Sequence, residues 1–363
     1  MQERTGIEKG GRRLNARSAI ALVGSIAVAG AIGVVVSSRH HDPALLRHPS
    51  QAPVSPRPVT TSPVSLQPQA GAGISLADDL ATHEVVLFGG VGDYANTWLW
   101  NGSVWARAQP PASPAGRFGA SEAYDPQTKT VMLFGGRLEP GTPVHDTWAW
   151  NGSTWTPIDS GAGGPEPGEG SDMAWDPAID QMVLLTRSGV ISEPAQTWIW
   201  AGTHWTQPSD GALPAGATYS PMWFDPVTRS LLAVGCCVGP PPSTGAVNTT
   251  WRWSGSSWTL LPPTIGAPVD GSTMALDPAL DRLVLCACAA TPSAGIELWD
   301  WDGHEWASLP AAPLPVAAGV EVTAGAQLLV FGAPKSPPQS GEPPVEVWSF
   351  TPQSAWVQLG RSP

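Results

Sequence analysis

The chain has 363 residues, of which 42% are hydrophobic and 13% charged, with 40 glycines, 40 prolines and 19 tryptophans. It contains 18 basic residues (Lys and Arg) and 30 acidic residues (Asp and Glu). Eight of the basic but only three of the acidic residues precede residue 73, so residues 73–363 carry 10 basic and 27 acidic residues, a net charge of −17. This acidity argues against nucleic acid and anionic membrane surfaces as partners.

Residues 18–38 are uncharged and rich in Ala, Val, Ile and Gly, and a run of this length can cross a bilayer. We expect a single-pass transmembrane anchor there, with residues 1–17 in the cytoplasm and the rest outside, because basic residues precede the run: Arg4, Lys9, Arg12, Arg13 and Arg17. A cleaved signal peptide, and hence a secreted protein, is the alternative. Its cleavage site would be Ala27-Val28-Ala29, which lies in the middle of the run.

Residues 39–72 are predicted to form a linker, because they contain Pro43, Pro49, Pro53, Pro56, Pro58, Pro63 and Pro68. A proline-rich chain is extended and stiff, at about 3.1 Å per residue. This segment could hold the following domain as far as roughly 90 Å from the membrane.

Residues 73–363 are predicted to form one repeat domain. A set of three tryptophans begins at Trp98, Trp148, Trp198, Trp251 and Trp299, and a degenerate sixth copy consists of Trp348, Phe350 and Trp356. The first members lie 48 to 53 residues apart. A constant period of this size is typical of a repeat architecture, in which each unit buries its apolar face against its neighbours.

Each repeat contains four short strand candidates separated by turn residues, as the second repeat shows for residues 119–125, 130–134, 146–150 and 153–155. Asp125-Pro126 marks the first turn, because Pro presets a turn φ and Asp can bond its own backbone. Asn101-Gly102 and Asn151-Gly152 indicate hairpins. A two-residue turn at Asn101-Gly102 would pair Trp98 with Trp105 and bring three indoles to one face. Four-stranded units stacked radially form a β-propeller.

The repeat unit has a fixed order: an apolar run, Phe-Gly-Gly, a loop, Thr-Trp-x-Trp, Asn-Gly and Trp. This order resembles the kelch repeat of galactose-oxidase-type propellers. Phe88-Gly89-Gly90 and Phe134-Gly135-Gly136 carry the double-glycine signature, whereas the third, fourth and fifth repeats depart from it. The resemblance covers roughly residues 73–359 and implies an all-β, six-bladed propeller. We expect residues 74–77 to form the first innermost strand and the sixth blade to end near residues 356–359. Kelch proteins share no common activity, so the resemblance implies a fold rather than a function.

The four cysteines fall in two adjacent repeats. Cys236 and Cys288 occupy the slot of the second glycine of Phe-Gly-Gly, with Cys237 and Cys286 beside them. Because thiols outside the cytoplasm tend to oxidise, we expect all four cysteines to form disulfides between blades, with Cys236 close enough to Cys288 for a bridge. A vicinal Cys236–Cys237 bond is possible but strained. Free buried thiols and a Cys₄ metal site are the alternatives, and the Cys-Cys and Cys-x-Cys spacings disfavour the metal.

Catalytic and metal-binding patterns are not apparent in the sequence. Its histidines show no ligand spacing, and its three tyrosines do not group with histidines as a galactose-oxidase copper site would require. We therefore assign no catalytic residue, metal or cofactor. Seventeen of the 19 tryptophans belong to the periodic motif and are predicted to be core. The remaining two, Trp175 and Trp223, are predicted to be core as well.

The long, variable loops after Phe-Gly-Gly and after the last Trp should share one end of the propeller, where function usually resides. Binding candidates on that face are Asp93, Tyr94, Arg117, Arg137, Glu139, His145, Arg187, Glu193 and the loop 239–247. We expect an extracytoplasmic binding scaffold that recognises a protein or a cell-envelope glycan. A carbohydrate-acting enzyme at the same face and a purely structural envelope protein are the alternatives. An enzyme should gather groups with perturbed pKa values, whereas a binder should present an apolar hollow or patch.

Overall fold

The computed structural model describes residues 67–69, 71–166, 171–186, 194–213, 221–236, 248–263, 273–288, 296–309, 316–324, 327–334, 343–351 and 355–360. The expected cytoplasmic segment, the anchor at residues 18–38 and nearly all of the linker lie outside this set. The described residues are all-β, with no helix, and so contain no helical segment suited to span a membrane.

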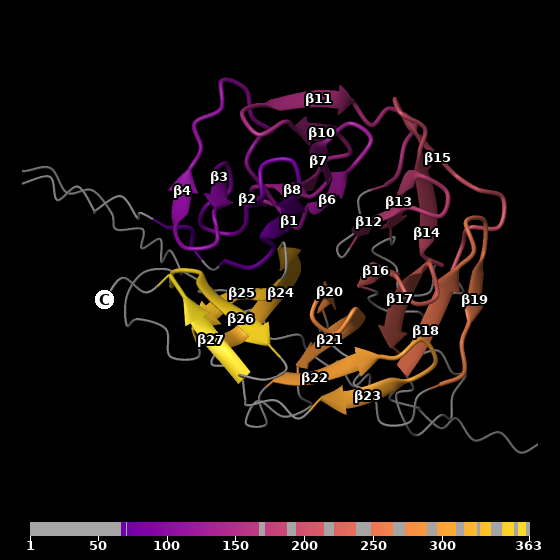
Figure 1. The fold of residues 1–363 in the computed structure, drawn as a ribbon. Coiled ribbons are helices and arrows are strands. Elements are labelled where there is room, and N and C mark those ends of the chain that lie inside the picture. Colours follow the sequence, from indigo (N-terminus) through magenta and orange to yellow (C-terminus); the bar gives the residue numbers. More distant parts are fainter. Residues whose placement is uncertain are drawn as a thin grey trace, which may run out of the picture. The chain divides into compact units, whose positions relative to one another are not determined.

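Six antiparallel sheets of four strands each, here called blades one to six in chain order, make up the fold (Figure 1). Blade one consists of β1 (Ser75–Asp79), β2 (Glu84–Phe88), β3 (Thr97–Trp100) and β4 (Trp105–Arg107). Blade two consists of β6 (Ser121–Asp125), β7 (Thr130–Phe134), β10 (Thr147–Trp150) and β11 (Trp155–Asp159). Blade three consists of β12 (Asp172–Asp176), β13 (Gln181–Thr186), β14 (Gln196–Trp200) and β15 (Trp205–Thr206).

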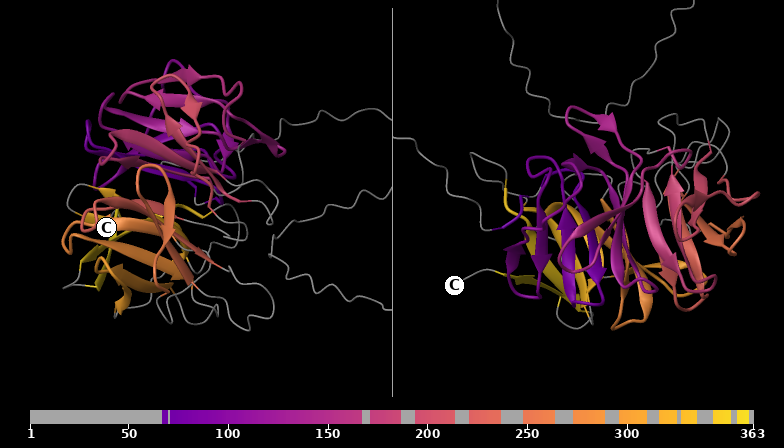
Figure 2. Two further views of the ribbon diagram at one scale, coloured as in Figure 1. Left: turned by 90° about the vertical axis from the view of Figure 1, so that its right-hand side faces the viewer. Right: turned by 90° about the horizontal axis from the view of Figure 1, so that it is seen from above.

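Blade four consists of β16 (Met222–Asp225), β17 (Ser230–Cys236), β18 (Asn248–Trp253) and β19 (Trp258–Leu260). Blade five consists of β20 (Thr273–Asp277), β21 (Arg282–Cys288), β22 (Ile296–Trp301) and β23 (Trp306–Leu309). Blade six consists of β24 (Val316–Ala324), β25 (Gln327–Pro334), β26 (Glu346–Thr351) and β27 (Ala355–Leu359). A small extra sheet joins β5 (Arg117–Phe118), β8 (Arg137–Leu138) and β9 (Thr142–Pro143), and Figure 2 shows the β8–β9 hairpin projecting beyond the blades.

The blades close into a ring. The innermost strands β1, β6, β12, β16, β20 and β24 each contact the next, and β24 contacts β1. The described residues form six hydrophobic clusters, and the buried members of each come from two neighbouring blades. The predicted β-propeller is therefore confirmed, with each blade made from one continuous segment. An isolated bridge between Gln69 and Pro344 also ties the chain before blade one to blade six.

The Asp-Pro turns behave as predicted, because the buried carboxylates of Asp125 and Asp176 accept hydrogen bonds from the backbone N–H two residues on. The hairpin register differs from the prediction. Trp100, not Trp98, lies opposite Trp105, with ring centroids 5.4 Å apart. The reason is that the Asn101 side chain accepts hydrogen bonds from the N–H groups of residues 103 and 104, which makes a four-residue loop. The three indoles still share one cluster.

The outermost tryptophans also link the blades. In four of them the indole N–H donates a hydrogen bond to a threonine hydroxyl on the third strand of the preceding blade: Trp155 to Thr97, Trp205 to Thr147, Trp258 to Thr197 and Trp306 to Thr250. All four threonines are the first residue of a Thr-Trp-x-Trp sequence. The pattern is thus explained by contact between blades.

Candidate functional site

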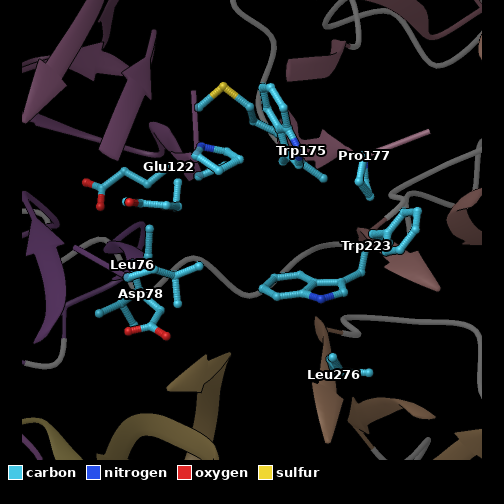
Figure 3. Close-up of a pocket in the computed structure, with 15 residues that line it drawn as sticks. Leu76, Asp78, Glu122, Trp175, Pro177, Trp223 and Leu276 are labelled. Carbon is cyan, nitrogen blue, oxygen red and sulfur yellow. The ribbon is translucent and has the colours of Figure 1, made fainter. Parts of the chain in front are cut away.

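A cavity of about 280 Å³ lies among the innermost strands of blades one to five. Figure 3 shows Leu76, Trp175, Trp223 and Leu276 converging on it from four different blades. Leu80, which is 53% exposed, and two prolines of the Asp-Pro turns also line the cavity, so it reaches the end of the ring where those turns lie.

Trp223 departs from the internal repeat. When the blades are aligned by the register of their first two strands, its slot holds alanine in blades one, two, three and five: Ala77, Ala123, Ala174 and Ala275. Those alanines are buried, so the blade architecture itself needs only a small side chain at this slot. The indole of Trp223 instead occupies space at the axis.

Trp175 occupies the next slot toward the turn, where blades one, two, four and five carry Asp78, Tyr124, Phe224 and Leu276. Both non-periodic tryptophans therefore line the same cavity. The prediction that they are ordinary core residues needs correction: each is half-buried and packs against a core cluster with part of its surface, but also forms the cavity wall. Aligning the repeats would have revealed Trp223, because a large residue there replaces alanine.

Glu122 lies in the cavity wall, and its carboxyl group turns away from the two indoles toward blade one (Figure 3). Its Oε1 is 2.8 Å from the Ser75 hydroxyl oxygen, which also lies 3.0 Å from the carbonyl oxygen of Phe88. Ser75 has a single hydroxyl proton, and the carbonyl can only accept. Ser75 therefore shares this one proton between Glu122 Oε1 and the carbonyl oxygen of Phe88.

The surroundings of the Glu122 carboxyl group favour its neutral, protonated form. Burial raises the pKa of this carboxyl group to about 8, although the hydrogen bond with Ser75 acts in the opposite direction. Glu122 Oε2 is buried without a hydrogen-bond partner, which disfavours a negative charge there. At neutral pH this part of the cavity wall is therefore uncharged.

Asp172, the first residue of β12, is a second carboxyl group affected by burial, which raises its pKa to about 7 despite two backbone hydrogen bonds. It accepts these from the N–H of Met222 at 2.5 Å and of Met173 at 2.9 Å. The first of them joins blade three to blade four. Asp172 thus connects neighbouring innermost strands and does not line the cavity.

Arg117, predicted as a binding residue, is buried at 1% exposure and holds the loops of blade two together. Its guanidinium donates to both carboxylate oxygens of Asp146, at 2.6 and 3.0 Å, and to the carbonyl of Gly135 at 2.9 Å. Burial opposes the ionisation of Asp146, but the hydrogen bonds from Arg117 and Trp148 outweigh it, and the pKa of Asp146 is lowered. This bidentate pair positions loops within the protein.

The other described candidates at the long-loop end do not meet in one site. Asp93 accepts a hydrogen bond from the indole N–H of Trp98 at 2.6 Å, and Tyr94 packs edge-on against Phe118. Arg137 donates to the carbonyl of Gly141 within the β8–β9 hairpin, whose tip carries Glu139. His145 lies 3.2 Å from the carbonyl of Pro165. None of them lines the axial cavity, and Arg187, Glu193 and the loop 239–247 lie outside the described residues.

Cys286 is buried between blades five and six and forms no disulfide. Cys236 and Cys288 lie at the ends of β17 and β21, but their side chains, and all of Cys237, are outside the described set. The Cys236–Cys288 bridge therefore stays a prediction. Among the described residues, three or more His, Cys, Asp or Glu side chains nowhere gather as metal ligands would.

Comparison with known proteins identifies the fold only. No family model matches the chain, and no curated protein does so. The solved structure of YjhT is similar with a TM-score of 0.52 and 12% identity, over 82% of this chain and 100% of that one. A fucose-specific lectin from Aleuria aurantia has a TM-score of 0.54 and 11% identity, over 81% and 97% of the two chains. A mutant of AofleA from Arthrobotrys oligospora has a TM-score of 0.54 and 12% identity, over 82% and 90%. These neighbours have β-propeller-type folds.

Proposed function

We propose that this protein is a kelch-type propeller, anchored in the membrane and facing outward, that binds a glycan in its axial cavity. The observation that carries the proposal is the convergence of Trp175 and Trp223 on that cavity. They are the two tryptophans outside the repeat motif, and one of them replaces an alanine that four other blades keep.

Aromatic faces suit a sugar, because an indole offers a large flat apolar surface against which the C–H face of a pyranose can stack. The cavity volume is near the lower limit of small-ligand sites, which favours one sugar ring over an extended chain. The similarity in fold to fucose-binding lectins supports a glycan as the ligand, since it shows that a propeller scaffold can carry such a site.

Two features of the sequence support this location. An apolar run at residues 18–38 after a basic segment favours an anchor with its N-terminus inside, and the proline-rich residues 39–72 would hold the propeller away from the bilayer. Protease treatment of intact cells tests this placement. Release of a propeller-sized fragment is expected, and a chain that is cut only after cell lysis would contradict it.

The binding proposal is tested with the full-length protein in detergent on an array of envelope glycans and their monosaccharide units. Trp223→Ala, which restores the residue that the other blades use, should weaken binding at least tenfold with little change in melting temperature. Leu260→Ala, at an exposed position away from the cavity, is the matched control and should bind normally. A wild-type protein that binds no glycan, or a Trp223→Ala variant that binds as the wild type does, would contradict the proposal.

A further inference from the structure

The cavity has a polar rim and an apolar interior. Of the 15 described residues that line it, Asp78, Glu122 and Tyr124 carry carboxyl or hydroxyl groups, Trp175 and Trp223 each carry an indole N–H, and the rest are apolar. Asp78 and Tyr124 stand directly before the turn aspartates of their strands and so lie close to the mouth. Leu76 and Met173 lie two positions further from the turn on their strands than the residues of that slot, and they line the deeper part of the cavity.

Glu122 shares the deeper slot with Leu76 and Met173 but adds no charge there. Its carboxyl group points away from the indoles, contacts Ser75 at 2.8 Å and has Oε2 shielded from solvent. A ligand group in the interior of the cavity would thus meet Leu76, Met173 and the indole of Trp223. Among the described lining residues other than Glu122, the carboxyl and hydroxyl groups lie near the mouth.

We infer that the cavity selects an uncharged sugar bearing an apolar substituent, such as a deoxy methyl or an acetyl group, that enters with this substituent first. This inference rests on the proposed function and specifies its ligand class. A hydroxyl group buried among Leu76, Met173 and Trp223 would lose its hydrogen bonds to water with only the indole N–H of Trp223 to replace them, whereas a methyl group would gain from burial. Hydroxyl groups on the opposite side of the ring would stay near the mouth, beside Asp78, Tyr124 and water.

The charge of the cavity lining also favours an uncharged sugar. Asp78 is acidic, and no Lys, Arg or His occurs among the described residues that line the cavity. A uronic acid would therefore bring its carboxylate close to a like charge. The pocket should disfavour acidic sugars even when their rings have the same size.

The test measures affinities of the full-length protein in detergent for matched methyl glycosides: a hexose, its 6-deoxy counterpart, its 2-acetamido counterpart and its uronate. The 6-deoxy or the acetamido sugar should bind roughly tenfold more tightly than the hexose, since one buried hydroxyl without a partner has about that effect. The uronate should bind most weakly. Asp78→Asn, which removes one charge with little change in volume, should raise the affinity for the uronate several-fold relative to that for the hexose.

Three results would overturn the inference. The hexose or the uronate could bind as tightly as the substituted sugars, Asp78→Asn could leave the uronate unaffected, or cyclohexanol could bind as tightly as any sugar, which would indicate a general apolar pocket. If no glycoside binds at all, the proposed function itself fails. If sugars bind without the expected order, only the ligand class fails.

Discussion

The indole N–H of Trp155 in blade two donates a 2.9 Å hydrogen bond to the hydroxyl of Thr97 in blade one. The equivalent bond is absent at Trp105 and Trp356, whose indole nitrogens are buried without a partner. By register, the threonine slot of the preceding blade holds Val347 in the first case and Leu298 in the second. The protein therefore contains contacts between blades both with and without this Trp–Thr hydrogen bond, and the two kinds can be compared.

Thr97→Val should destabilise the protein by about 1–2 kcal/mol, because it leaves the buried Trp155 N–H without an acceptor while it hardly changes the side-chain volume. Thr97→Ser keeps the hydroxyl and should cost less. Val347→Thr offers Trp105 an acceptor and should be neutral or stabilising. Urea denaturation monitored by tryptophan fluorescence measures all three. A Thr97→Val variant as stable as the wild type would show that the bond contributes nothing.

Glu122→Gln should alter how stability depends on pH. The pKa of Glu122 is raised from 4.5 to about 8 in the folded protein, so the folded state holds this proton more tightly than the unfolded state does. Stability from this group is fully present below pH 4.5 and is lost as pH rises toward 8, by at most about 1.4 kcal/mol per pH unit. The glutamine variant lacks this loss. Its stability relative to the wild type should increase from pH 5 to pH 8, and a constant difference would contradict a proton on Glu122.

Asp146→Ala should be strongly destabilising, by about 3 kcal/mol, because it leaves the buried guanidinium of Arg117 without its counter-charge. The lowered pKa of Asp146 adds a second signature: its contribution to stability is present above pH 3.8 and is lost as pH falls further. Denaturant unfolding at pH 7 and pH 3 measures both effects. The glycan affinity of the folded fraction should be unchanged. A loss of affinity would indicate that Arg117 belongs to the binding site.

Trp175→Leu introduces the residue that blade five carries in the same slot, so it should weaken glycan binding without unfolding the protein. Trp150→Leu is the comparison, since Trp150 is fully buried in the periodic core. Removing that indole leaves a cavity and should cost about 3 kcal/mol or more. Binding isotherms should therefore show the larger loss of affinity for Trp175→Leu, and thermal melts should show the larger loss of stability for Trp150→Leu. Equal effects on stability would mean that Trp175 is only a core residue.

Mass mapping without reduction tests the cysteines. Cys286 should resist alkylation in the folded protein and react after unfolding, because it is buried and free. Cys236 and Cys288 are expected to be found joined. Their modification as free thiols in the exported protein would contradict the bridge.

Much of the architecture could be predicted from the sequence, because its signals are local. The tryptophan period indicated six units, and the Asp-Pro turns marked where first strands end, since turn chemistry acts over three or four residues. The predicted final strand near residues 356–359 agrees with β27, and residues 74–77 overlap β1. The hairpin pairing was wrong because the Asn101 side chain bonds two backbone N–H groups and lengthens the loop beyond what the Asn-Gly signal implies.

The candidate site depended on contacts between distant repeats, which no local pattern encodes. Trp175 and Trp223 lie 48 positions apart in the sequence and meet only because the ring brings their innermost strands to one axis. Glu122 is kept neutral by burial and contacts Ser75, 47 residues away, and Arg117 is tied to Asp146 across the loops of one blade. The sequence by itself determined the blades and their number, whereas ring closure decided which side chains line the cavity and which are held within the structure.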